Sequence, residues 1–161
     1  MARFATGVCV LSTSDGLVDH AMTANAFTSV SLEPLLVLVC VETEARLHDA
    51  LVDNGDWAIS VLNAGARPTA DWLATRGRPL HGQLDRVPHR RGPITGAALV
   101  ESALAWLECR TFAVHPAGDH SVVIGEVLGV ELASNDTDTH RDNAGADAAL
   151  LYYRSEYRRV D

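Results

Sequence analysis

The sequence contains no lysine, since all 13 of its basic residues are arginine. This absence excludes a lysine Schiff base and a P-loop lysine, and with them pyridoxal-phosphate catalysis and Walker-type phosphoryl transfer. Neither a G-x-S-x-G nor a G-x-G-x-x-G motif occurs. A dinucleotide, if one binds, therefore does not bind in a Rossmann crevice.

Cysteine and long apolar runs are also scarce. Cys9, Cys40 and Cys109 form no C-x-x-C pair, so they predict reduced, buried thiols and neither a zinc ribbon nor a thioredoxin-type site. No apolar run approaches the ~20 residues that span a bilayer, and the first residues show no secretory signal. The histidines at 20, 48, 115 and 140 lack ligand spacing. The sequence predicts a cytoplasmic protein without a metal or a membrane.

Length and charge narrow the class further. With 161 residues and 47% hydrophobic content, the chain fits one compact domain over 1–161. A net charge of −8 argues against nucleic acid as a partner.

Short apolar or alternating segments separated by turns predict a mainly β protein. Strands are expected at 7–13, 18–22, 26–31, 35–41, 57–62, 103–114, 121–132 and 150–153, and short helices at 46–52 and 66–74. The run 35–41 lacks polar residues and predicts a strand buried on both faces. Segments 76–96 and 133–148 predict irregular loops, and 116–119 predicts a hairpin turn. Many short strands with few helices favour an antiparallel barrel.

A polar corner between two of these strands is the best candidate for a ligand site. Thr23, Ala24 and Asn25 have short side chains, so a ligand can approach the backbone there, and Ser29 and Ser31 add hydroxyl groups. These residues favour a polar ligand without identifying it.

Four motifs in order give the chain a family resemblance. They are GVCVLST at 7–13, MTANAFTSVSLEP at 22–34, PAGDHSVVIGEVLGV at 116–130 and LLYYRSEY at 150–157. Because it has these four motifs in this order, the chain resembles the flavin reductases that supply reduced flavin to two-component monooxygenases. The resemblance implies an antiparallel Greek-key split β-barrel with a few short helices, usually a homodimer. It also implies FMN or FAD as the flavin, NADH or NADPH as the reductant, and a separate monooxygenase as partner.

The resemblance also implies a set of site residues. Those expected at the flavin are Thr23, Ala24, Asn25, Ala26, Ser31, Cys40, Val41, Thr43, Arg46, Leu47, Arg78, His81, His120, Tyr152, Tyr153 and Arg154. His120, in the Gly-Asp-His turn, is expected to face the nicotinamide and to be the catalytic residue. The chain departs from the family at Glu42 and Glu44, because carboxylates there would repel a phosphate. This departure predicts a loosely held flavin.

Hydride transfer between two cofactors requires no protein acid or base, so a binding site rather than a catalytic triad is expected. Other interpretations remain open. They are a flavin carrier or sensor without catalysis, an enzyme similar to pyridoxamine-phosphate oxidase, and a barrel that binds no flavin. The motifs do not distinguish FMN from FAD as the flavin, or NADH from NADPH as the reductant.

Overall fold

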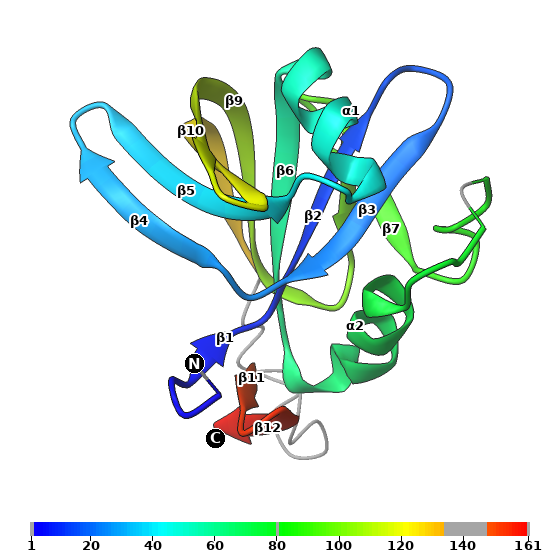
Figure 1. The fold of residues 1–161 in the computed structure, drawn as a ribbon. Coiled ribbons are helices and arrows are strands. Elements are labelled where there is room, and N and C mark those ends of the chain that lie inside the picture. The colour runs from blue at the N-terminus through cyan, green and yellow to red at the C-terminus, as the bar shows by residue number, and fades with distance from the viewer. Residues whose placement is uncertain (1, 80, 134–147, 161) are drawn as a thin grey trace.

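The computed structural model describes residues 2–79, 81–133 and 148–160 (Figure 1). Its main feature is a seven-stranded antiparallel sheet in the order β3-β2-β6-β9-β10-β5-β4. The strands of this sheet are β2 (Cys9–Ser14), β3 (Asp19–Ala24), β4 (Phe27–Leu32), β5 (Leu35–Glu42), β6 (Asp56–Leu62), β9 (Ala103–Ala117) and β10 (His120–Leu132). The helices are α1 (Arg46–Asn54) and α2 (Arg67–Ala74), with a 3-10 turn at Ala64–Ala66.

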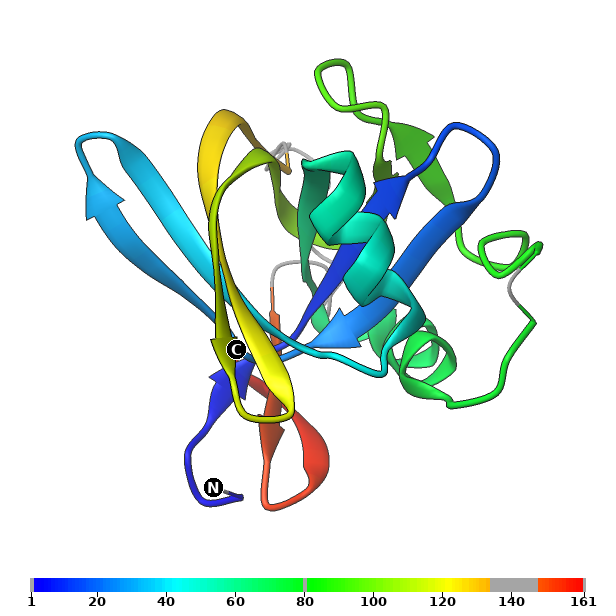
Figure 2. The ribbon, with the colours of Figure 1, turned by 45° about the horizontal axis from the view of Figure 1, so that its top comes forward.

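The sheet curls because its two edge strands are consecutive in the chain. Only Asn25 and Ala26 separate β3 from β4, although these strands lie at opposite edges of the sheet. At this junction the Cys40 N–H donates to the Ala26 carbonyl at 3.0 Å, and the Cys9 thiol contacts the Ala24 carbonyl at 3.3 Å. Away from it β4 and β5 extend as an arm (Figures 1 and 2). The architecture is the predicted split barrel.

One core fills the barrel beneath α1. Leu47 and Leu51 of α1 pack with Trp57 of β6 and with apolar residues of β2 and β5. A side chain at Gly125 would overlap the Trp57 ring, so glycine is required where β10 crosses this tryptophan. α1 is therefore attached to the sheet through Leu47 and Leu51.

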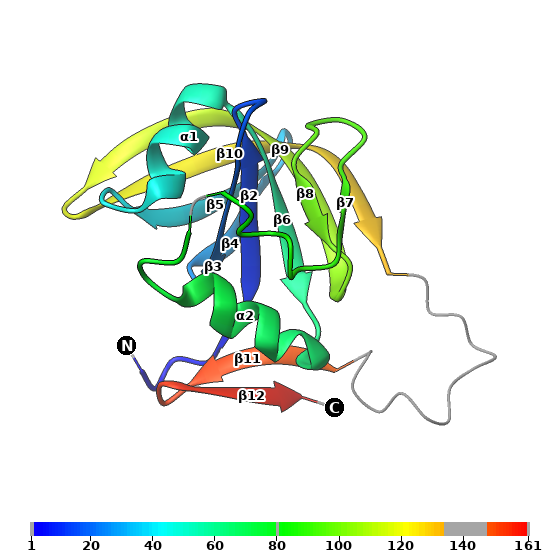
Figure 3. The ribbon, with the colours of Figure 1, turned by 90° about the vertical axis from the view of Figure 1, so that its right-hand side faces the viewer.

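A second core lies on the other side, under α2. Ala70 and Leu73 of α2 pack with Val10, Leu62 and Val100. A small sheet of β1 (Thr6–Gly7), β11 (Ala149–Tyr153) and β12 (Glu156–Val160) lies beside α2 (Figure 3). Arg154 and Ser155 form its two-residue turn with φ of 54° and 61°.

The structure corrects several sequence predictions. β5 is not buried along both faces: Val37, Val39 and Val41 are buried, whereas on the opposite face Leu36 is buried but Leu38 and Cys40 are only half-buried. Segment 76–96 is not wholly irregular, since β7 (His89–Arg91) pairs with β8 (Ala98–Val100). The strand at 150–153 is not the last, because β12 follows it.

Other boundaries shift by a few residues. Thr23 and Ala24 belong to β3, so the corner shrinks to Asn25 and Ala26. β9 continues through Ala117, which leaves Gly118 and Asp119 as the hairpin turn. Most of the predicted loop 133–148 lies outside the described residues. None of the described helices is long and apolar enough to cross a membrane.

Candidate functional site

The outer edge of β3 is covered by the loop that follows α2. Gln83 Nε2 donates to the Asp19 carbonyl, and Arg78 Nη2 donates to the Ala21 carbonyl. Trp72 Nε1 in turn donates to the Gln83 carbonyl at 2.7 Å. These side chains occupy acceptors that an edge strand otherwise leaves open, so they hold the loop across β3.

A cavity of about 430 Å³ opens between this loop, β3 and the start of α1. Three parts of the chain contribute its walls. They are His20, Ala21, Met22 and Thr23 of β3; Glu42, Glu44, Ala45, Arg46 and Leu47 around the start of α1; and Leu73, Ala74, Thr75, Arg76, Gly77, Arg78 and Gln83 around the end of α2. The cavity is therefore built where both helices meet the edge strand.

Three arginines line this cavity. Arg46 Nη2 donates to the Arg78 carbonyl at 2.7 Å, and Arg78 Nη1 donates to the Thr75 carbonyl at 2.9 Å. Burial, and then repulsion by Arg46, lower the pKa of Arg78. Arg78 Nε is buried and has no hydrogen-bond partner among the described residues. An anionic group in the cavity would offset the repulsion between the two guanidinium groups.

The two carboxylates that distinguish the sequence have different environments. Glu42 binds Arg76 through both oxygens, at 2.8 and 3.0 Å, so its charge is matched. Glu44 is exposed and does not cap α1, whose N-cap is Ala45 without a side-chain hydrogen bond. Only Glu44 is therefore left to oppose an anion at the mouth of the cavity.

The Gly-Asp-His turn lies directly beside the cavity wall. His120 on β10 pairs in register with Glu42 on β5, which lines the cavity. The Thr43 N–H and hydroxyl both donate to the Asp119 carbonyl, at 2.9 and 3.2 Å. His120 Nδ1 lies 2.7 Å from Asp119 Oδ1, and this hydrogen bond lowers the pKa of Asp119. The His120 ring is 42% exposed, so a ligand can reach it.

Of the predicted site residues, Thr23, Arg46, Leu47 and Arg78 line the cavity. The Thr23 hydroxyl donates to the Ala70 carbonyl at 2.7 Å, which ties β3 to α2. Leu47 is buried and forms the apolar floor. Thr43 and His120 lie next to the cavity, through the contacts with Asp119 and Glu42.

The other predicted residues do not line it. Ala24, Asn25, Ala26, Cys40 and Val41 lie at or near the junction of β3, β4 and β5, and Ser31 lies on β4, where its hydroxyl accepts from the Glu33 N–H. His81 borders a second, separate hollow of about 260 Å³. Tyr152 packs edge-on against Tyr157 at 5.4 Å, and Arg154 lies over the Tyr153 ring at 5.3 Å. The aromatic and cationic groups of this last motif therefore contact one another within the small sheet.

His20, Met22 and Gln83 line the cavity although sequence reasoning did not select them. His20 and Met22 are two residues apart on β3, so their side chains lie on the same face of the strand. This spacing could have identified them from the sequence. Gln83 carries no such signal, because its position depends on how the loop after α2 folds over β3.

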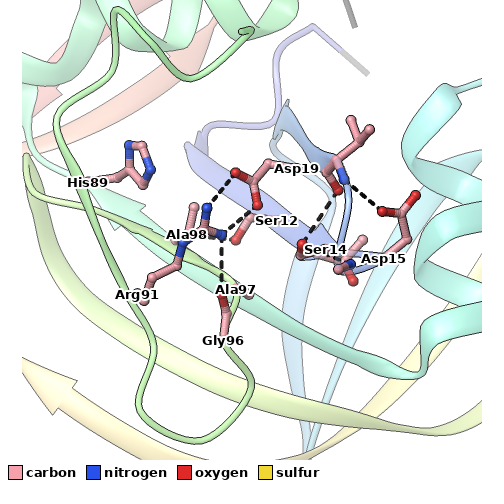
Figure 4. Close-up of polar contacts among 12 residues, drawn as sticks. Ser12, Ser14, Asp15, Asp19, His89, Arg91, Gly96, Ala97 and Ala98 are labelled. Carbon is pink, nitrogen blue, oxygen red and sulfur yellow. Dashed lines mark hydrogen bonds and ion pairs between the residues drawn. The ribbon is translucent and has the colours of Figure 1, made fainter. Parts of the chain in front are cut away.

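The second hollow contains an ion pair that fastens β7 to β3. Arg91 Nη1 and Nη2 donate to the two oxygens of Asp19 at 2.5 and 2.7 Å, and Arg91 also reaches the Gly96 carbonyl (Figure 4). The hydrogen bond with Arg91 lowers the pKa of Asp19 and raises that of Arg91. Both charges are thus matched without a ligand, which gives this hollow a structural role.

The model of the "Flavin reductase like domain" family matches residues 1–161. The chain belongs to this family. This flavin reductase-like domain is 43% identical over 126 residues to an NADH-dependent FAD reductase of Streptomyces globisporus, covering 78% of the chain and 69% of the relative. It is 36% identical over 160 residues to the reductase component of 4-hydroxyphenylacetate 3-monooxygenase of Thermus thermophilus, covering 99% and 92%.

Solved structures agree with this assignment. BorF, the flavin reductase component of a bacterial two-component tryptophan halogenase, superposes with a TM-score of 0.86 at 42% identity, over 99% of this chain and 92% of BorF. The NADH:FAD oxidoreductase SgcE6 of Streptomyces globisporus, solved with NAD and FAD fragments, gives a TM-score of 0.86 at 34% identity, over 99% and 88%.

Proposed function

We propose that the chain is an NAD(P)H-dependent flavin reductase, which transfers a hydride from reduced nicotinamide to FMN or FAD and supplies the reduced flavin to a separate monooxygenase. The observation that carries this proposal is the cavity at the edge of β3. There Arg46 and Arg78 line one cavity, beside the exposed His120 of the Gly-Asp-His turn.

The residues of the cavity fit a flavin phosphate. A guanidinium group binds phosphate oxygens through N–H donors of fixed geometry, and both Arg46 and Arg78 line the cavity. Arg46 begins α1, so the positive end of the helix dipole adds to its charge. Leu47 and Met22 supply apolar contacts. Arg46, Arg78 and Thr23 would hold the ribityl-phosphate half of the flavin.

A bound flavin would accept the hydride, so this chain has to bind the flavin and the nicotinamide, orient their rings and shield them from water. We assign His120 to the nicotinamide, because its exposed ring lies beside the cavity and is oriented by Asp119. Asn25 and Ala26, at the junction of the two sheet edges, are the proposed contacts of the flavin ring. Proximity of two flat rings accounts for catalysis without a protein base.

We further propose that flavin is a diffusible substrate. Glu42 engages Arg76, so this arginine is not free to bind the phosphate. Glu44 stands unpaired by any described side chain at the cavity mouth, so its charge works against tight retention. A reductase that passes flavin to another enzyme has to release it.

The proposal also includes an oligomeric state and a cellular location. The assembly is a homodimer, supported by the exposed apolar residues Val30, Leu32, Leu35 and Phe112 on the β4–β5 arm and β9. The location is the cytoplasm, supported by three unpaired thiols, since reducing compartments keep cysteines in this state.

The test is NADH oxidation by purified protein with FMN, FAD or riboflavin added in turn. Flavin-dependent turnover that saturates with added flavin supports the reductase and ranks its substrates. Flavin binding without NADH turnover would instead support the second candidate, a flavin carrier or sensor. The two carboxylates of the 42–45 segment, which depart from the family, favour this candidate.

A further inference from the structure

Two residues that line the cavity form an ion pair with each other. Glu42 ends β5 and Arg76 belongs to the loop after α2, so the pair joins two walls of the cavity. Arg76 Nη2 donates to both Glu42 oxygens, at 3.0 and 2.8 Å. The side chain of Arg76 is 82% exposed and that of Glu42 is 33% exposed. Solvent, and hence a ligand, reaches both side chains.

The geometry of this pair favours exchange of the carboxylate for another anion. One nitrogen of Arg76 serves both oxygens, so the pair is not the arrangement of two parallel N–H···O bonds that makes arginine–carboxylate pairs strong. Exposed ion pairs contribute little to stability, because water solvates both charges well. Arg46 and Arg78 are instead fastened to backbone carbonyls. The partner of Arg76 is a side chain, which can turn away.

A phosphate is a stronger partner for Arg76 than the carboxylate. At neutral pH a phosphate monoester carries a charge of about −1.5 to −2 and presents three acceptor oxygens. A guanidinium group binds such oxygens in parallel pairs. The cavity lining also holds more arginines than carboxylates, with Arg46, Arg76 and Arg78 against Glu42 and Glu44. A phosphate can bind Arg76 only by displacing Glu42.

We propose that Glu42 competes with the flavin phosphate for Arg76. A bound phosphate takes the place of the carboxylate on Arg76, and Glu42 takes this arginine back as the flavin leaves. Glu42 thus weakens the binding of the phosphate and speeds its release, which suits a flavin that is passed to another enzyme. The inference rests on the proposed function, because it assumes that flavin occupies this cavity.

The test compares FMN with riboflavin, which has no phosphate, using quenching of flavin fluorescence to measure Kd. Glu42→Gln keeps the shape of the side chain and frees Arg76. The Kd for FMN should fall about tenfold, as one more hydrogen bond between charged groups predicts, and the Kd for riboflavin should stay within about twofold. Stopped-flow measurements should place the difference in the rate of FMN release, where most affinity differences between related complexes lie.

A double variant separates this competition from simple repulsion by Glu42. Glu42→Gln combined with Arg76→Gln should lose the gain and bind FMN within about threefold of the wild type, because the freed arginine is then missing. Asp56→Asn is the matched control, since Asp56 binds Arg110 in a similarly exposed pair, at 2.8 and 3.2 Å, and does not line the cavity. This control should leave the Kd for both flavins within about twofold.

Three results would overturn the inference: an unchanged Kd for FMN in Glu42→Gln, an equal gain for FMN and riboflavin, or a gain that persists in the double variant. Failure of the proposed function looks different. In that case wild-type protein oxidises no NADH with any flavin, while the phosphate-dependent effect of Glu42 on binding persists.

Discussion

At the scale of single residues, the site consists of charges that the fold holds but does not fully match. Arg78 is anchored by two backbone carbonyls, whereas Glu42 is bound by Arg76. His120 is fixed by its neighbour Asp119 and remains open on its other side. These residues differ in how far their polar groups are already paired within the fold, and we assign their roles from this difference.

His120 should affect the nicotinamide more than the flavin. His120→Ala removes a side chain beside the cavity but none of the arginines, so we expect the KM for NADH to rise about tenfold and the Kd for FMN to stay within about twofold. Steady-state kinetics and fluorescence titration measure the two constants. Unchanged kinetic constants would remove His120 from the mechanism.

Glu44 should weaken flavin binding by repulsion. Glu44→Gln keeps the size of the side chain and removes the charge, so the Kd for FMN should fall about twofold to threefold, a difference that shrinks in high salt. Glu33→Gln, on the exposed turn between β4 and β5, is the matched control. If both variants bind FMN as the wild type does, Glu44 points away from the phosphate.

At the scale of elements, the site depends on how one loop crosses the edge of β3. Gln83 and Arg78 bind the carbonyl groups of β3, and Arg91 binds Asp19 on the same strand. Sequence periodicity predicted β2, β5, β6, β10 and both helices to within a few residues, because burial sets their pattern. It missed β7, β8 and β12, which are short and polar or lie between turns. It also missed His20 and Gln83, since a contact between a loop and an edge strand leaves no local pattern.

The Asp19–Arg91 pair should stabilise this loop in a pH-dependent way. The folded-state pKa of Asp19 lies below its ordinary value of 3.8, so the pair stabilises the fold above that pH and loses its effect as pH falls through the lower, folded-state pKa. Asp19→Asn should therefore cost about 1 kcal/mol in the free energy of unfolding at neutral pH. Urea titrations at neutral pH and at about pH 2.5 measure the change, with Asp85→Asn as control. A deficit of equal size at both pH values would show that the charge of Asp19 is not what stabilises the loop.

At the scale of the whole molecule, the β4–β5 arm exposes apolar residues that a monomer does not bury. Leu32 on β4 is 83% exposed, and Phe112 on β9 of the same sheet is 60% exposed. If this surface is the dimer interface, Leu32→Ser combined with Phe112→Ser should shift the mass measured by light scattering from dimer toward monomer. Leu17→Ser provides the control, because Leu17 is equally apolar and 93% exposed but lies in the β2–β3 turn. A wild-type protein that is monomeric at micromolar concentration would contradict the proposed assembly.

The anaerobic stoichiometry of NADH and added flavin, measured with flavin in large excess over protein, distinguishes a flavin reductase from a flavin carrier. Each NADH consumed should reduce one flavin, and the protein should turn over many equivalents, because the flavin leaves after each cycle. Reduction that stops at one flavin per protein chain, or flavin that binds and is never reduced, would contradict a reductase that releases its product.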